Sequence, residues 1–327
     1  MFRFPMKNKR VWQFIHECVQ QQTPVLLLAV VESHGASPGK AGFKMAVAAS
    51  GERCGTIGGG AMEVTWVNRS LQILAEPDQS AAIRKLFHSR ETGHEQSGLI
   101  CSGSQSILFR PLMQSLRQDI DGIMSMYDQH GAGSLEISSS GFAFSPNSRN
   151  AVDYSFQMTS EAEWLYRENL GVLDTVYIVG SGHVGLALSR IMATLDFRVV
   201  VLDDRPDAET FVQNSFAHEK ICAAYDTVGN HMPGMNREYV AVVTTAYKTD
   251  EAALQSILKK NPKYVGLMGS EAKTRQIFDD LRQVGVPEES LLKIHVPIGV
   301  PISSHTPEEI AVSVAAEIIK ERNESGV

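Results

Sequence analysis

Two glycine-rich stretches are the parts of this sequence whose residue types and spacing suit chemistry. The first, CGTIGGGAME, places Thr56, Gly58, Gly59 and Gly60 just ahead of Glu63 and of a run with helical spacing. Glycine turns at the start of a helix expose backbone N–H groups that bind anionic oxygens. We therefore interpret Thr56 and the three glycines as candidates for binding an anionic part of a ligand, and Glu63, on the first turn of the helix behind them, as a further candidate of the same site. A tight strand-to-helix connection without a ligand is the alternative.

The second stretch, VYIVGSGHVG, has the form of a dinucleotide-binding turn. Gly180, Gly182 and Gly185 form GxGxxG between an expected strand and an expected helix, and Asp203 ends the next strand about twenty residues on. Such an aspartate suits a ribose 2′-hydroxyl, so the motif indicates binding of NAD or another nucleotide. His183 is either a donor to phosphate or a histidine that only begins the helix.

The composition is that of an ordinary folded protein. Of its 327 residues 43% are apolar and 20% charged, so two domains of about 150 residues each are expected. The formal net charge of −7 argues against nucleic acid as a partner. The opening residues lack an apolar signal-peptide core, and VLLLAVV is too short to span a membrane. We therefore expect a cytoplasmic protein with no membrane partner.

Hydrophobic patterns indicate the elements that position the two stretches. A helix at about residues 7–21, a buried strand in TPVLLLAVVES and another strand in FKMAVAAS precede the first stretch. A strand at about residues 105–110 closes the sheet of this part. We predict an N-terminal α/β domain over residues 1–115, a connector with a hairpin meander over 116–173, and a Rossmann-like domain over 174–327.

The second half of the chain alternates strands and helices. This order predicts a doubly wound parallel sheet, so the fold class is α/β. The last helix has an explicit start signal in HTPEEIAVSVAAEIIK. Thr306 is expected as its N-cap, Pro307 as its first residue and Glu309 as the acid of a capping box.

Several segments, taken in order, resemble the XdhC/CoxI family, whose members are xanthine dehydrogenase accessory factors. In the first half they are GASPGKAGFKMAV, GTIGGGAME and LICSGSQSILFRP. In the second half they are VYIVGSGHVG, VVVLDDRP, YVGLMGS and PIGVPISSHTPEEIAVS. The resemblance covers both expected domains, and several motifs together are far more specific than one GxGxxG.

The resemblance implies a maturation factor for molybdenum hydroxylases in purine catabolism. Such a factor binds molybdenum cofactor (molybdopterin) as cargo, supports its sulfuration with a cysteine desulfurase, and delivers it to an apo xanthine dehydrogenase-type hydroxylase. It is a cofactor-binding chaperone more than a catalyst. Anion-binding turns suit this cargo because molybdopterin carries a phosphate and an oxo-metal centre.

The resemblance also adds single residues to the candidate site. Lys44 matches the family's pattern near the first loop, although a solvated surface lysine is the alternative. His183 matches a family histidine, and Cys101 matches a cysteine that would contact molybdenum or relay sulfur. The chain departs from the family at Tyr247, where many relatives have histidine, and at Glu271, where arginine is common.

Other functions compete with this interpretation. The alternative is an NAD-dependent oxidoreductase that uses GSGHVG, but the sequence identifies no residue set for hydride transfer. A xanthine dehydrogenase itself is excluded, because four scattered cysteines cannot ligate two iron–sulfur clusters. A pure interaction module is disfavoured by the intact GxGxxG. Reduced thiols and a homodimer are expected.

Overall fold

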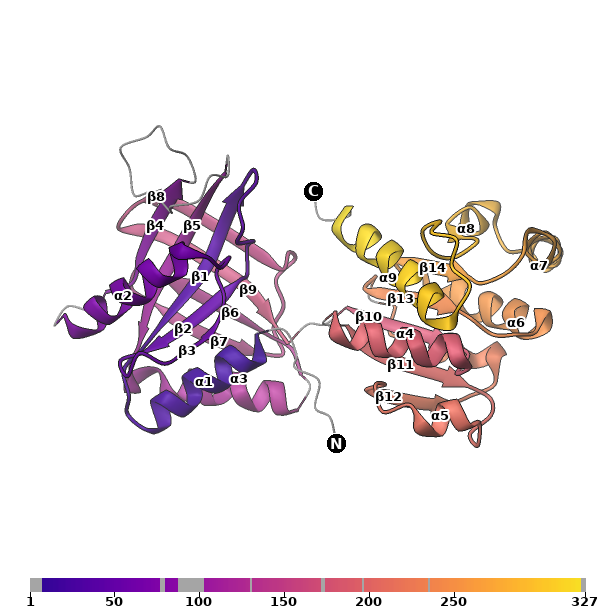
Figure 1. Ribbon diagram of the computed structural model, residues 1–327, viewed down its shortest axis with the longest axis horizontal. Helices are drawn as coiled ribbons and strands as arrows, with labels where there is room; N and C mark the ends of the chain where they lie inside the picture. The colour runs from indigo at the N-terminus through magenta and orange to yellow at the C-terminus, as the bar shows by residue number, and fades with distance from the viewer. Residues whose placement is uncertain are drawn as a thin grey trace. The chain divides into compact units, whose positions relative to one another are not determined.

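The computed structural model describes residues 8–76, 80–87, 103–129, 131–171, 174–195, 197–234 and 236–324. The chain forms two compact units that divide between Val172 and Leu173 (Figure 1). Within the described residues, no helix is long and apolar enough to cross a membrane.

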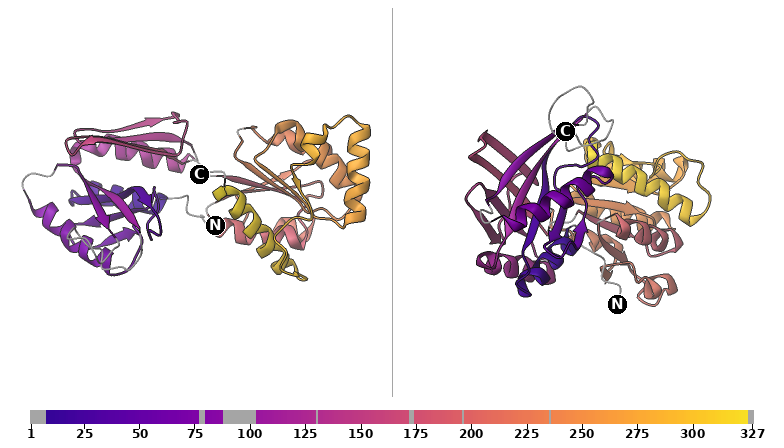
Figure 2. Two further views of the ribbon diagram at one scale, coloured as in Figure 1. Left: turned by 90° about the horizontal axis from the view of Figure 1, so that it is seen from above. Right: turned by 60° about the vertical axis from the view of Figure 1, so that its left-hand side comes forward.

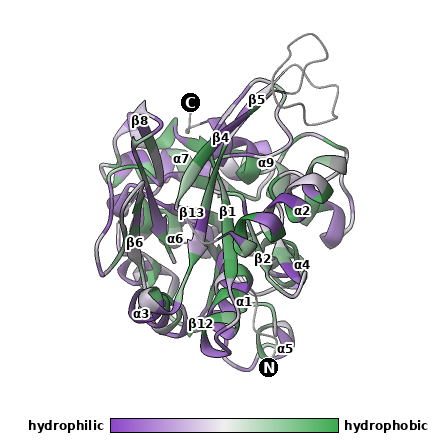
Figure 3. Cartoon of the chain, turned by 90° about the vertical axis from the view of Figure 1, so that its left-hand side faces the viewer, coloured by the Kyte–Doolittle hydropathy of each residue, from purple (hydrophilic) through white to green (hydrophobic). Residues whose placement is uncertain are grey.

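The first unit contains a five-stranded antiparallel sheet in the order β3-β2-β1-β5-β4. Strand β1 is the central strand of this order, and its first seven residues are buried. Its hydrophobic run is green in Figure 3. Helix α2 packs on this sheet through Trp66, whose ring centroid lies 4.7 Å from that of Phe109. The bounds are β1 Val25–His34, β2 Lys44–Ala48, β3 Arg53–Gly55, α2 Ala61–Ala75, β4 Ala82–Phe87 and β5 Ser104–Leu112.

The segment expected to be a connector is instead an integral part of the first unit. Its two hairpins join through β6 and β9 into a four-stranded sheet of order β7-β6-β9-β8, the magenta layer in Figure 2. Strand β9 buries every second residue, so one face of this sheet points into the interior of the first unit. The bounds are η1 Gln114–Leu116, α3 Arg117–Asp128, β6 Gly133–Ser138, β7 Phe142–Pro146, β8 Tyr154–Ser160 and β9 Glu163–Leu170.

Helix α1 (Lys9–Gln20) links this segment to the rest of the first unit. It contacts α3 and β2, and the fully buried Trp12 meets Phe142 edge-on at 6.3 Å between ring centroids. The connector interpretation is therefore corrected: residues 116–171 close the core of the first unit.

The second unit has a six-stranded sheet in which all strands are parallel, as predicted. The order β12-β11-β10-β13-β14-β15 means that the chain builds outward from β10 on one side and then crosses to β13. The topological switch point, where ligands bind in such sheets, therefore lies between β10 and β13. The bounds are β10 Thr175–Val179, β11 Arg198–Asp203, β12 Glu219–Cys222, β13 Glu238–Val242, β14 Tyr264–Leu267 and β15 Ile294–His295.

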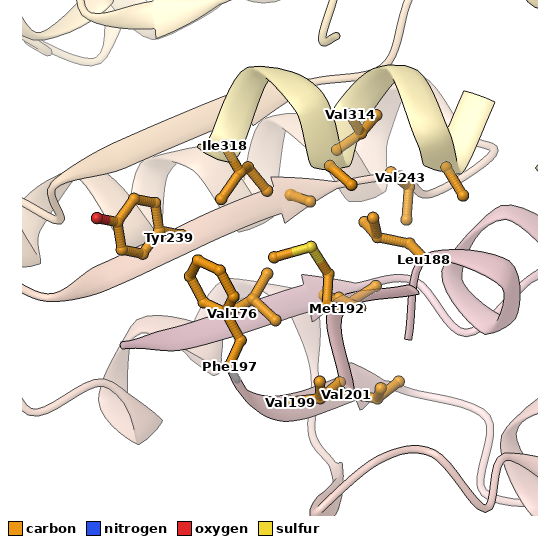
Figure 4. Packing of buried hydrophobic residues seen from close by; sticks show 14 of the residues in the cluster. Val176, Leu188, Met192, Phe197, Val199, Val201, Tyr239, Val243, Val314 and Ile318 are labelled. Carbon is orange, nitrogen blue, oxygen red and sulfur yellow. The ribbon is translucent and has the colours of Figure 1, made fainter. Parts of the chain in front are cut away.

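Helices cover both faces of this sheet because neighbouring residues of each strand point to opposite faces. Val176 of β10 packs under Leu188 of α4 and Val314 of α9 (Figure 4), whereas Tyr177 and its neighbours pack on the other face with α6 and α7. The bounds are α4 His183–Thr194, α5 Glu209–Gln213, η2 Tyr225–His231, α6 Tyr247–Ile257, η3 Leu258–Lys260, α7 Glu271–Gln283, α8 Glu288–Leu291 and α9 Pro307–Glu324.

The start of α9 confirms the predicted capping box. The Oγ1 atom of Thr306 accepts a hydrogen bond from the Glu309 amide at 3.2 Å, and Glu309 Oε2 accepts from the Thr306 amide at 3.1 Å. The His305 amide donates to the same carboxylate at 2.7 Å. This local signal was readable in the sequence because all its partners lie within four residues.

Candidate functional site

The turn between β10 and α4 places its three glycines in different surroundings. Gly180 has a φ of +111°, and a Cβ there would lie 2.9 Å from the carbonyl carbon of Val243 across the switch point. A Cβ at Gly185 would lie 2.1 Å from the Gly180 oxygen. A Cβ placed at Gly182 would meet no atom of the described residues within 4 Å. Two glycines are thus needed for packing, and the space at Gly182 is open.

Asp203 ends β11 beside this turn and is fully buried. Its Oδ2 accepts from the Ser181 amide at 2.7 Å, from the Ser181 hydroxyl at 2.8 Å and from Arg205 Nη2 at 3.0 Å. Its Oδ1 accepts from the Arg205 amide at 3.0 Å and from Arg205 Nε at 2.9 Å. The predicted ribose acceptor therefore already receives five hydrogen bonds from its own chain.

The same bonds set the protonation of Asp203. Burial alone raises the pKa of a carboxyl group, but the hydrogen bonds from Arg205 and Ser181 outweigh it and hold the pKa of Asp203 well below its usual range. Asp203 also raises the pKa of the Arg205 guanidinium, through their hydrogen bonds and opposite charges. The pair is therefore a charged, bidentate clamp at ordinary pH.

His183 is the first residue of α4, and its side chain is exposed. It lies next to the open position at Gly182, where the first amides of a helix have no intrahelical partner. The structure therefore brings Gly180, Gly182, His183, Gly185 and Asp203 together at one edge of the parallel sheet, as the motif predicted.

A second polar cluster stands at the same edge and was missed from sequence. Asp250 on α6 is fully buried, and its carboxylate accepts from the hydroxyl of Thr244 and forms an ion pair with Lys273 of α7. Burial raises the pKa of Asp250, although Lys273 and Thr244 oppose this shift. Its only sequence signal was an aspartate on the apolar face of a helix, which does not reveal its partner.

In the first unit, the GTIGGG loop binds a carboxylate of its own chain. Glu63 Oε1 accepts from the Thr56 hydroxyl at 2.6 Å, from the Ile57 amide at 2.9 Å and from the Gly59 amide at 2.8 Å. Burial acts to raise the pKa of Glu63, but these three bonds outweigh it and lower the pKa below its ordinary value. The loop is thus an anion-binding nest that Glu63 occupies.

The other residues of this loop support the nest. The Gly58 amide donates to Thr56 Oγ1 at 3.2 Å, and a Cβ at Gly58 would lie 2.8 Å from the Gly39 nitrogen. Gly60 has a φ of +73° and directly precedes α2. Thr56, Gly58, Gly59, Gly60 and Glu63 are therefore one group, as the sequence predicted. The sequence did not predict that Glu63 would be the bound anion.

Lys44 lies in the interior of the first unit. Its ammonium is fully buried and contacts Glu168 Oε2 at 2.5 Å, and Tyr166 donates its hydroxyl to the same oxygen at 2.9 Å. The carbonyl of Lys44 also accepts from the Thr56 amide at 2.8 Å, which fixes the base of the GTIGGG loop. The structure gives Lys44 a partner within the chain, in place of the ligand contact or solvated position considered from sequence.

The cysteines add no metal site within the described residues. Cys101 lies outside the part of the chain that the structure describes, so its predicted contact with molybdenum stays a prediction. Burial raises the pKa of Cys54, whose thiol donates to the Arg10 carbonyl at 3.5 Å. Among the residues described, no three His, Cys, Asp or Glu side chains are grouped closely enough to hold a metal ion.

Comparison with known protein families matches both halves of the chain in order. The model of the XdhC and CoxI family matches residues 18–84, and the model of the XdhC Rossmann domain matches residues 176–318. Together they cover more than half of the sequence and include both glycine-rich turns. The chain belongs to the XdhC/CoxI family. Its second unit is the XdhC Rossmann domain, with the Gly180–Gly185 turn at its first strand.

Individual relatives extend this family likeness over nearly the whole chain. The chain is 25% identical over 307 residues to the uncharacterized protein YqeB of Escherichia coli K12, covering 93% of this chain but 44% of YqeB. It is 23% identical over 326 residues to a Bacillus subtilis 168 protein named as a probable subunit of xanthine dehydrogenase, covering 94% of this chain and 96% of that protein.

A solved structure shares the fold of this XdhC/CoxI protein. A crystal structure from Bacillus halodurans, described as a xanthine dehydrogenase, superposes with a TM-score of 0.73 and covers 96% of each chain at 20% identity. At this identity the likeness concerns the fold alone.

Proposed function

We propose that this protein is an accessory factor that binds molybdenum cofactor, supports its sulfuration and delivers it to a xanthine dehydrogenase-type hydroxylase. Its membership in the XdhC/CoxI family supports this function. So does its likeness to a relative named as a probable subunit of xanthine dehydrogenase. The protein would act as a carrier, with the cofactor as its cargo.

The observation that carries the proposal is the open Rossmann turn. Gly182 leaves free space at the start of α4, where unpaired helix amides and the helix dipole favour an anion. His183 is exposed at the same place and adds a donor. These groups fit the terminal phosphate of molybdopterin.

An NAD-dependent oxidoreductase is disfavoured by the same site. The acid expected to bind the adenosine ribose, Asp203, is fully buried and receives five hydrogen bonds from Ser181 and Arg205. A ribose hydroxyl would need Arg205 to leave before it could donate to this carboxylate.

The carrier function implies protein partners. We include in the proposal an apo hydroxylase that accepts the cofactor, a cysteine desulfurase that supplies sulfur, a homodimer as the active form, and a role in purine catabolism. The roles of the hydroxylase and of the desulfurase are testable with purified components, because transfer to an apo hydroxylase restores an activity that can be followed optically.

The decisive experiment is an anaerobic titration of the full-length protein with molybdenum cofactor and, separately, with NADH. Gly182→Asp places a carboxylate in the open space, and Gly182→Asn is its uncharged match. We expect molybdenum to be retained after desalting by the wild-type chain and by Gly182→Asn, and at least tenfold less by Gly182→Asp. Retention of NADH but not of molybdenum would contradict the proposal.

A transfer assay separates binding from delivery. The loaded protein is mixed with an apo xanthine dehydrogenase-type hydroxylase, and recovered activity is measured with and without a cysteine desulfurase and cysteine. We expect recovery only from loaded protein, and greater recovery when the desulfurase is present. Equal recovery from free cofactor would contradict a delivery role.

A further inference from the structure

The Asp203–Arg205 clamp bears on which ligands the Rossmann unit accepts. In a dinucleotide-binding unit, the acid at the end of the second strand accepts hydrogen bonds from the adenosine ribose. Here the side chain of Asp203 is 0% exposed, and that of Arg205, which covers it, is 55% exposed. Arg205 therefore stands where a ribose would have to enter.

The clamp lies directly beside the glycine turn. Asp203 Oδ2 receives both the Ser181 amide at 2.7 Å and Arg205 Nη2 at 3.0 Å, so the guanidinium and the turn share one acceptor atom. Nε of Arg205 binds the other carboxylate oxygen at 2.9 Å. This two-oxygen geometry orders the arginine, because bidentate arginine–carboxylate pairs are the stronger kind of ion pair.

The neighbouring charge disfavours a phosphorylated ribose as well. An arginine at this position can accommodate the 2′-phosphate of NADP. In this chain, the half-exposed Asp204 carboxylate lies 3.8 Å from Arg205 Nε. The two aspartates outnumber the single arginine, so a 2′-phosphate would meet a net negative charge. Neither NADH nor NADPH therefore suits the ribose position.

We propose that Arg205 is the specificity-determining residue of this unit: it closes the ribose position, so the ligand is one that ends in a phosphate at the Gly180–Gly182 turn and not a dinucleotide. Applied to the cargo, this selects molybdenum cofactor that ends in a phosphate monoester over the same cofactor extended by a nucleotide. The inference rests on the part of the proposed function that assigns a ligand to this turn.

The test asks whether removing the Arg205 side chain increases the affinity of the protein for NADH. Arg205→Ala removes the two guanidinium hydrogen bonds that cover Asp203, while the bonds from Ser181 and from the backbone amide of residue 205 remain, so one side of the carboxylate opens to a ligand. We expect NADH, followed by its fluorescence, to bind Arg205→Ala about tenfold or more tightly than it binds the wild-type chain, because hydrogen bonds to a charged acceptor are then available. A merely structural arginine would give equal or weaker binding on removal.

Three further variants keep this test interpretable. Arg205→Lys retains a cation but cannot bind both carboxylate oxygens as a fork, and should give a smaller gain. The double variant Arg205→Ala with Asp203→Asn should lose the gain. Arg198→Ala removes an exposed arginine paired with Glu219 at the opposite end of β11 and should bind NADH as the wild type does. Circular dichroism checks that each variant is folded.

Several results would overturn the inference. Tight binding of NADH to the wild-type chain would show that the ribose position is open. Tight binding of NADPH alone, lost in Arg205→Ala, would make Arg205 a 2′-phosphate ligand. A folded Arg205→Ala protein with unchanged NADH binding would remove the gating role.

A separate arm compares the two forms of molybdenum cofactor. The wild-type chain should retain the phosphate-terminated form at least tenfold better than the nucleotide-extended form, and Arg205→Ala should reduce that preference. If no molybdenum cofactor binds but NADH binding is gained in Arg205→Ala, the gate stands and the carrier function fails. If both forms bind equally well, the carrier function stands and the gate is contradicted.

Discussion

The two glycine-rich turns look alike in sequence, but a different residue fills the third position of the helix that follows each. In α2 that residue is Glu63, whose carboxylate returns to bind the Ile57 and Gly59 amides. In α4 it is Gly185, which has no side chain to return. The first turn therefore holds its own anion, and the second stays open at Gly182. In this protein the acid on the first turn of the following helix is what separates an occupied turn from an open one.

The turns also differ in what supports them. The first rests on Lys44, whose carbonyl holds the Thr56 amide and whose ammonium is buried against Glu168. The second rests on close backbone packing between Gly180 and Gly185. One turn thus depends on a charge pair between distant segments, and the other on local steric fit.

The largest expected effect is a loss of stability when the cation that supports the first turn is removed. Lys44→Met leaves the Glu168 carboxylate buried without its cation, which should destabilise the first unit by about 3–5 kcal/mol. All three tryptophans, Trp12, Trp66 and Trp164, lie in that unit, so tryptophan fluorescence in urea reports its unfolding selectively.

The matched control replaces both partners. Lys44→Met with Glu168→Leu should recover most of the lost stability, because a buried ion pair is often replaceable by apolar side chains. A loss below about 1 kcal/mol in the single variant would contradict the importance of this pair.

The second effect tests steric support in the Rossmann turn. Gly185→Ala forces a Cβ to within 2.1 Å of the Gly180 oxygen and should destabilise the second unit by about 1–3 kcal/mol. Gly182→Ala meets open space at a φ of −60° and should change stability by less than about 0.5 kcal/mol. Thermal unfolding followed by circular dichroism checks both; equal losses would contradict the distinct roles of the two glycines.

The third effect is expected when the Glu63 carboxylate is removed from the nest of the first turn. Glu63→Ala frees the Ile57 and Gly59 amides, so we expect a loss of about 1 kcal/mol and a new response to sulfate. Sulfate should raise the melting temperature of Glu63→Ala, read by tryptophan fluorescence, more than that of the wild type. Glu52→Ala, which removes an exposed acid of the same unit, is the control. An unchanged sulfate response would mean that the nest does not accept an external anion.

The smallest effect is a pH dependence. The pKa of Glu63 is lower in the folded chain than its ordinary value of about 4.3, so its stabilising effect is fully present above that value and is lost as the pH falls through the folded pKa. Between about pH 5 and pH 3 the wild type should therefore lose slightly more stability than Glu63→Gln. Urea midpoints from tryptophan fluorescence at several pH values measure this difference, and parallel curves would contradict it.

Much of the second unit was predictable because its signals are local. The GxGxxG turn, the strand that ends at Asp203 and the capping box of Thr306 and Glu309 all depend on neighbours within one βα unit. The sheet of residues 133–170 was predicted only as a meander in a connector. Its role appears when β9 brings Glu168 to Lys44, 124 residues earlier in the chain.

The sequence by itself determined where the two turns lie and which backbone freedom they need, since glycines and helix periodicity act over a few residues. It also placed the chain in its family. Only the tertiary structure decided which groups are already in use: Glu63 fills one turn, and Arg205 covers Asp203 beside the other. The physical reason is that a donor or acceptor is free for a ligand only if no side chain packed against it makes that hydrogen bond first.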